Sequence, residues 1–168
     1  KNECAIEKYV GTSVDIVVPE TLFSVPVTVI KRDAFSSGLT YSGNGTGAQQ
    51  KHNKTIKSIK LPESIVKIDD YAFANCFKLK KINLDNDLIY IQNYVFANCT
   101  SLDIDKIYCR YIYGNAFRGC VSLKELELKC YQIGKYTFYE CLNLEKITIP
   151  LDILSIDYHA FDKCKKIW

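Results

Sequence analysis

The chain has 168 residues, of which 48% are hydrophobic and 24% charged, a balance close to that of soluble globular proteins. This composition excludes a disordered or collagen-like chain. The formal net charge of +3 is too small to indicate binding of nucleic acid or an anionic membrane, and no stretch approaches the length of a membrane-spanning helix.

In chain order, the sequence divides into residues 1–37, an aperiodic segment of residues 40–54 and a periodic region of residues 55–168. The segment 40–54 is rich in Gly, Asn, Gln and Lys, which predicts an inserted surface loop. Its alternating glycines do not predict a phosphate site, because no buried strand leads in and no helix with a Lys-Ser/Thr pair leads out. Tyr41 is the loop residue best suited to anchor a partner.

The periodic region repeats the motif Ala-Phe-x-x-Cys-x-x-Leu-x-x-Ile-x-Leu with small variations. Its phenylalanines are separated by 23, 21, 21 and 23 residues: Phe73, Phe96, Phe117, Phe138 and Phe161. The Leu-rich end alternates with period two and predicts a strand, whereas the Phe-to-Leu spacing predicts a helical or 3₁₀ turn. One unit cannot bury its apolar face alone, but stacked units can. We therefore predict an α/β repeat, a right-handed solenoid of 21–23-residue units with a parallel β-sheet on one face.

Five of the eight cysteines follow the repeated phenylalanines by three residues: Cys76, Cys99, Cys120, Cys141 and Cys164. A fixed place in the repeat predicts buried free thiols that pack as small apolar groups. Cys109 and Cys130 form a second column, for which a single disulfide is an alternative. No zinc or other metal site is expected, because the sequence has no CxxC motif and neither histidine lies in a cysteine cluster.

Asp105 occupies a position that points inward in the other repeats, where Ile82 and Leu126 stand. A lone buried carboxylate is costly. A local slip of one residue would turn Ile104 inward and Asp105 outward, and we favour it over a buried functional aspartate.

The strand alternation also predicts which side chains point outward from the sheet. They form two rows, the first being Ser58, Lys81, Ile104, Glu125 and Lys146, and the second Lys60, Asn83, Lys106, Glu127 and Thr148. This strip is basic over three repeats, then acidic at Glu125 and Glu127, then basic again. Together with Tyr41, the polar residues of the strip that we select as candidate partner-binding residues are Ser58, Lys60, Lys81, Asn83, Lys106, Glu125, Glu127 and Lys146.

No arrangement of catalytic residues is evident. His52 lies in the loop, and His159 takes a turn position that is Tyr71, Tyr94, Asn115 or Tyr136 elsewhere. We therefore expect no enzyme activity and no cofactor. Three N-glycosylation sequons begin at Asn44, Asn53 and Asn98, and we expect the third to be a poor acceptor.

The pattern IxxIxLPxxxxxIxxxAFxxCxxL resembles the BspA-like leucine-rich-repeat family, surface proteins of host-associated bacteria and protists. The stretch from Tyr9 through Gly11, Val18-Pro19 and Pro26-Val27 to Ala34-Phe35 is similar to the opening unit of such arrays, which implies that residues 1–37 are that unit. The resemblance implies one leucine-rich-repeat solenoid domain over residues 1–168. It also implies an extracellular or cell-surface location, adhesion or binding of host proteins, and no catalysis.

Two functions are compatible with these observations. The first is a secreted or surface-displayed binding module that recognises a protein or glycan through the strand face, without membrane insertion. The second is a structural spacer or assembly segment of a longer array, because the final residues CKKIW end where another strand is expected and no polar cap follows.

Overall fold

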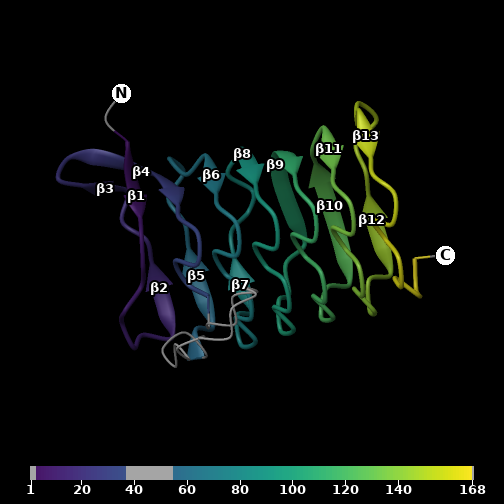
Figure 1. Cartoon of the computed structure of the whole chain (residues 1–168), viewed down its shortest axis with the longest axis horizontal. Helices are drawn as coiled ribbons and strands as arrows, with labels where there is room; N and C mark the ends of the chain where they lie inside the picture. The colour runs from purple at the N-terminus through teal and green to yellow at the C-terminus, as the bar shows by residue number, and fades with distance from the viewer. Residues whose placement is uncertain (1–2, 37–54, 168) are drawn as a thin grey trace, which may run out of the picture.

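The computed structural model describes residues 3–36 and 55–167, which form a stack of coils with strands side by side along the molecule (Figure 1). The predicted parallel-strand solenoid is confirmed. The strands are β1 (Cys4–Ile6), β2 (Asp15–Val17), β3 (Thr21–Leu22), β4 (Val25–Ile30), β5 (Ser58–Lys60), β6 (Lys67–Ile68), β7 (Lys81–Ile82), β8 (Leu88–Ile91), β9 (Lys106–Ile112), β10 (Glu125–Lys129), β11 (Gln132–Ile133), β12 (Lys146–Thr148) and β13 (Ser155–Ile156).

Most coils contribute two short strands, where the alternation predicts one. In the coils after the loop, β5, β7, β10 and β12 form the first set and β6, β8, β11 and β13 the second, while β9 extends through both. Equivalent strands pair in parallel, with Ser58 opposite Lys81 and Lys106 opposite Glu127. These offsets equal the 23- and 21-residue periods of the sequence, so the repeat fixes the register.

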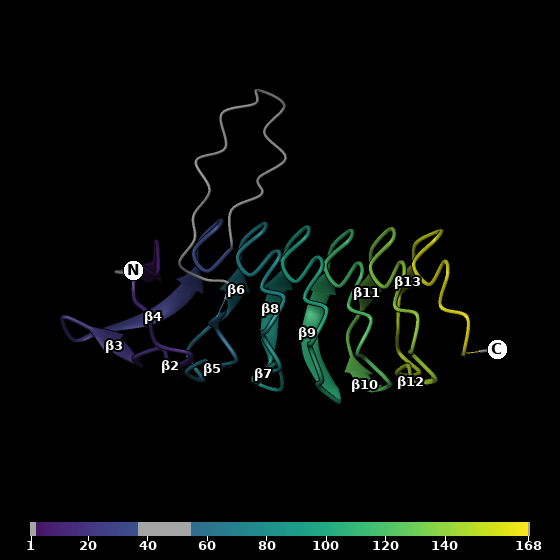
Figure 2. The same cartoon turned by 90° about the horizontal axis from the view of Figure 1, so that it is seen from below.

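The segment around each repeated phenylalanine is a series of hydrogen-bonded turns, and the described residues contain no α-helix. The N–H of Cys76 donates to the Phe73 carbonyl at 3.1 Å, which closes one such turn. Tyr71 and Asn75, two residues before and two after Phe73, have φ values of 58° and 60°. A left-handed residue on each side of the phenylalanine stops a right-handed helix from growing, which reduces the predicted helical turn to a tight bend. Figure 2 shows these turns in a row along one edge of the molecule.

The core contains a continuous ladder of phenylalanine rings. The ring centroids of Phe73, Phe96 and Phe117 are 5.1 Å apart at each step, and Phe138 follows at 5.5 Å. All four side chains are fully buried. Offset stacking of this kind adds to the hydrophobic stabilisation of each ring.

The cysteine column lies beside the ladder, and all eight cysteines are free, as predicted. Each column thiol donates to the phenylalanine carbonyl of the preceding coil: Cys99 to Phe73 at 3.2 Å and Cys120 to Phe96 at 3.1 Å. A cysteine is small enough for this site and supplies a weak donor to a buried carbonyl. Cys109 and Cys130 are also unpaired, so the alternative of a disulfide between them is not found.

Thiol labelling checks this assignment in solution. Seven cysteines are buried and Cys4 is half-buried, so a thiol reagent should label few groups in the folded protein. Unfolding in denaturant without reductant should expose all eight thiols. If unfolding releases only a few, disulfides hold the chain together and the assignment is wrong.

Candidate functional site

Most of the predicted outward residues lie on one face of the solenoid, where the first-strand set presents them in rows. Ile104 is the exception, because it is half-buried and packs against the core. Ser58 is opposite Lys81, and Glu125 is opposite Lys146, in one row. The second row contains Lys106, Glu127 and Thr148, which are opposite one another in turn. Lys60 and Asn83 lie on the same face in the preceding coils. Tyr41 lies outside the described residues.

The predicted placement of the two side chains at Asp105 is found, but without a shift of register, since Lys106 stays opposite Glu127 at the regular 21-residue offset. Asp105 is exposed, and Ile104 is half-buried and packs against the core. Because this segment does not pair with β7, strands β2, β5 and β7 form a separate three-stranded sheet. The break in the sheet on the strand face thus lies at the coil in which Asp105 replaces the apolar residue of the repeat.

The interruption coincides with a hollow of about 500 Å³ in that face. Predicted residues around it are Lys60, Lys81, Asn83 and Lys106, and the other polar residues are Asp85, Asp103 and Asp105. A smaller hollow of about 210 Å³ adjoins it and shares Asp105 and Lys106. It also contains Glu125, Glu127 and Lys146, so most of the predicted strip borders two neighbouring depressions.

The charges of the larger hollow differ from the sequence expectation of a basic run. Its three lysines are exposed, and none is within 4.0 Å of a carboxylate of the described residues. Three aspartates from neighbouring coils offset their charge. The strand alternation does not indicate Asp85 and Asp103, because both lie outside the alternating positions. Lys146 and Glu125 are 3.9 Å apart and both exposed, a contact of little energetic consequence.

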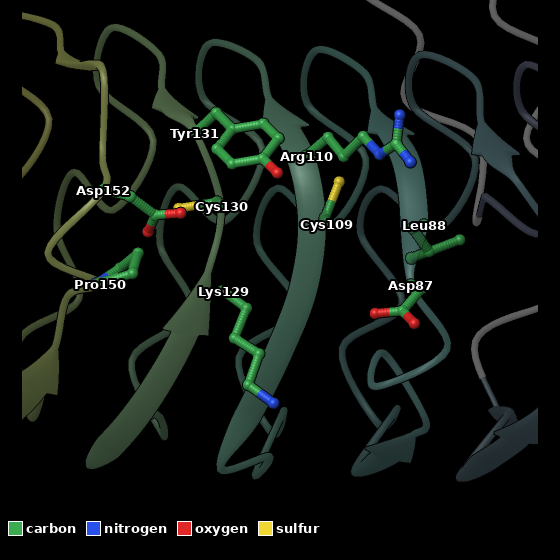
Figure 3. A pocket seen from close by; sticks show the side chains of 9 residues that line it. All are labelled: Asp87, Leu88, Cys109, Arg110, Lys129, Cys130, Tyr131, Pro150 and Asp152. Atoms are coloured by element: carbon green, nitrogen blue, oxygen red, sulfur yellow. The ribbon is translucent and has the colours of Figure 1, made fainter.

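A third depression arises from the difference in repeat length. The two 21-residue repeats have short connections at Cys109 and Cys130, whereas the coils on either side have longer ones that contain Asp87 and Asp152. Figure 3 shows the two cysteines between these aspartates, in a pocket of about 440 Å³. Burial raises the pKa of Cys109 to about 12 and that of Cys130 to about 11, which makes both thiols poor nucleophiles.

The remaining candidates have structural roles. His159 has the same left-handed backbone as Tyr136, stacks on its ring at 5.1 Å and lies 2.7 Å from the Asp162 carboxylate. His52, Asn44 and Asn53 lie outside the described residues. Asn98 is exposed, but its side-chain amide nitrogen, the atom to which a glycan would be attached, donates to the Asn75 Oδ1 atom at 3.0 Å, and its being a poor acceptor stays a prediction. In the part of the chain that the structure describes, no three His, Cys, Asp or Glu side chains are grouped to hold a metal ion, and no helix is long and apolar enough to cross a membrane.

Comparison with known proteins yields one family model and several solved structures. The model of the BspA type leucine rich repeat region matches residues 49–168 in six copies. A leucine rich cell surface protein from Faecalibacterium prausnitzii is 23% identical, with a TM-score of 0.73 over 94% of this chain and 41% of its own. The leucine rich repeat protein of T. pallidum is 23% identical, with a TM-score of 0.57 over 95% of this chain and 58% of its own.

A leucine-rich repeat protein from Eubacterium ventriosum has a TM-score of 0.66 at 18% identity, over 95% of this chain and 45% of its own. At these identities the likeness concerns the fold. As the coverages show, the chain spans less than two thirds of the length of each of these three structures. No curated protein matches the sequence.

Proposed function

Because the chain belongs to the BspA-type leucine-rich repeat family, we propose that it is a non-catalytic binding module that recognises a protein partner through its strand face. The proposed location is the cell surface or the extracellular space, since the structurally similar Faecalibacterium protein is described as a cell surface protein. Residues 1–168 are proposed as one solenoid domain, whose described core is a single cluster from Val18 to Cys164.

The observation that carries this proposal is the pair of adjoining hollows on the strand face. They bring Lys60, Lys81 and Lys106 from three successive coils beside carboxylates from the same and neighbouring coils. Exposed charges of both signs on a rigid, extended face set the orientation and specificity of a partner more than its affinity. A protein surface with a complementary charge pattern fits such a face better than a neutral glycan does.

Reversing Lys81 and Lys106 to Glu should weaken partner binding and reduce its dependence on salt, because both ammonium groups lie on this face without an ion-pair partner among the described residues. The measurement is binding of the labelled protein to immobilised cell-surface and matrix proteins at low and high salt, with purified glycans as a separate panel.

The matched control reverses Lys78 and Lys165 to Glu, which changes the net charge equally at exposed positions of the turn edge. Equal losses in both double variants would indicate a general charge effect and would contradict a site on the strand face. Binding to the glycan panel alone would assign the module to a carbohydrate partner.

The second candidate function, a spacer or assembly segment, is favoured by one observation. The coil around β12 and β13 leaves Leu151, Leu154, Ile156 and Tyr158 exposed. Exposed apolar side chains in a repeat stack are suited to bury against another unit. A protein that binds no surface or matrix protein, yet associates through these residues, would support this role over recognition.

A further inference from the structure

A groove of about 470 Å³ lies on the turn edge of the solenoid, among the residues that flank the repeated phenylalanines. It is distinct from the strand-face hollows, with which it shares no residue. Figure 2 shows the row of turns to which the groove belongs. Its lining residues come from four successive coils: Tyr71, Ala74, Asn75, Tyr94, Ala97, Asn98, Arg118 and Glu140.

The groove exists because two adjacent coils carry alanine directly after the repeated phenylalanine. Ala74 and Ala97 occupy the position that Arg118 and Tyr139 fill in the next two coils. The small side chains leave a depression in the first two coils, and Arg118 lies at the point where larger residues resume. Gly119 leaves room beside Asn98, because a Cβ at this position would meet the Asn98 Oδ1 atom at 2.8 Å.

The groove contains an aromatic pair and an amide pair. The rings of Tyr71 and Tyr94 are stacked at 5.0 Å, and no hydrogen bond from either hydroxyl to the described residues is formed. The side-chain amide of Asn98 donates to the Asn75 Oδ1 atom at 3.0 Å. Ring carbon, hydroxyl and amide groups therefore line the groove, and the two alanine methyl groups add apolar surface.

The charged residues that line the groove are Arg118 and Glu140, and the Arg32 guanidinium group, which is paired with Asp70, lies 5.9 Å from the centre of the Tyr71 ring. The Arg118 guanidinium group lies 4.7 Å above the Tyr139 ring and has no carboxylate within ion-pair distance among the described residues. The nearby carboxylate of Glu140 is paired with the Lys163 ammonium group at 2.9 Å. The guanidinium group of Arg118 is thus available to an anionic ligand. Such a planar group binds a carboxylate with two parallel hydrogen bonds.

The backbone of the groove does not offer a peptide the hydrogen bonds of an added strand. The N–H groups of Tyr71, Phe73 and Asn75 donate to carbonyls of the next coil, at 2.8–3.1 Å. In the following coil the N–H groups of Tyr94 and Asn98 also donate to carbonyls of the next coil, at 3.2 and 2.7 Å. Main-chain pairing is the source of affinity when an extended peptide adds to a fold. A ligand with many hydroxyls, which side-chain donors and acceptors can satisfy, fits this edge better.

We propose that the turn-edge groove binds a carbohydrate chain that carries a carboxylate, with the carboxylate at Arg118. Apolar C–H groups of the sugar units contact the tyrosines and the alanine methyl groups, and sugar hydroxyls exchange hydrogen bonds with Asn98 and the tyrosine hydroxyls. The site is independent of the strand face, so a protein partner and a glycan could be held at the same time.

The test uses a hyaluronan hexasaccharide, in which alternate units carry a carboxylate, and chitohexaose as its neutral counterpart. Binding to the whole chain is measured by calorimetry. The wild-type chain should bind hyaluronan more tightly than chitohexaose. Arg118→Ala should weaken hyaluronan binding about tenfold or more, as expected for loss of a charge-assisted hydrogen-bond pair, and leave chitohexaose binding unchanged.

A second variant fills the groove. Ala97→Arg introduces an arginine at the position that Arg118 holds in the next coil. The larger side chain should occupy the groove and abolish binding of both oligosaccharides. Leu142→Arg is the matched control, since it adds the same group to an exposed turn position outside the groove and should have no effect.

Four outcomes would overturn the proposal. They are undetectable binding of both oligosaccharides at millimolar concentration, equal affinity for the charged and neutral chains, unchanged binding in the Ala97→Arg variant, and equally tight binding of polyglutamate through Arg118. The last outcome would assign the groove to acidic peptides. Because Arg118→Ala alters a surface side chain, the test stands even if the Ala97→Arg variant fails to fold.

Discussion

The free energy of unfolding should fall steeply as the pH rises above 9, because most of the cysteines are buried in the neutral form. Burial raises the pKa of Cys76 and Cys109 to about 12 and raises those of Cys99 and Cys120 well above the usual value of a thiol. In the unfolded chain these thiols ionise near 9, so above that pH the unfolded state releases protons that the folded state keeps. The stabilisation is fully present below pH 9 and is lost as the pH rises toward the folded-state values.

The expected loss for each such thiol is about 1.4 kcal/mol per pH unit between the two pKa values. Denaturant melts at a series of pH values between 8 and 11, in reductant, measure it. Replacing Cys120 by Ala should lower the slope by one thiol's share relative to the unsubstituted chain. An unchanged slope would mean that alkaline unfolding has another origin, such as tyrosine ionisation.

Replacing Phe117 by Ala should destabilise the protein by about 3–5 kcal/mol, because it opens a cavity in the middle of the phenylalanine ladder. The ring is fully buried and stacks on Phe96 at 5.1 Å and on Phe138 at 5.5 Å, so two neighbouring coils lose contact with it. The midpoint and slope of a urea melt give the loss directly.

Phe161→Ala is the control at the end of the ladder. This ring is only partly buried, and its one ring neighbour among the described residues is Phe138, at 5.4 Å. Its removal should therefore cost clearly less than that of Phe117. A loss as large as that at Phe117 would contradict a stack whose contacts are densest in the middle.

Much of the candidate strand face could be predicted from the sequence. The period-two alternation places Lys81 and Lys106 outward because successive side chains of a strand point to opposite sides. The cost of burying a carboxylate was sufficient to predict that Asp105 is exposed, although no slip of register accompanies it. Whether this face binds a partner, and whether Tyr41 takes part, remain predictions.

Other features depended on which side chains meet across coils. Three features each combine residues at least one repeat apart in the sequence. They are the hollow at Asp105, the pocket at Cys109 and Cys130, and the groove over Ala74 and Ala97. Their shape follows from differences between neighbouring coils, in connection length or in side-chain size. A motif that describes what the coils share carries little information about such differences.

The sequence by itself determined the stack, its register and its core, because a fixed period of 21 or 23 residues puts the same apolar residue at the same place in every coil. The tertiary structure decided the second strand of most coils, the tight turns bounded by left-handed residues in place of helix, and the presence of Asp85, Asp103 and Asp105 beside the basic strip. These depend on backbone hydrogen bonds and distances between coils, which hydrophobic periodicity does not specify.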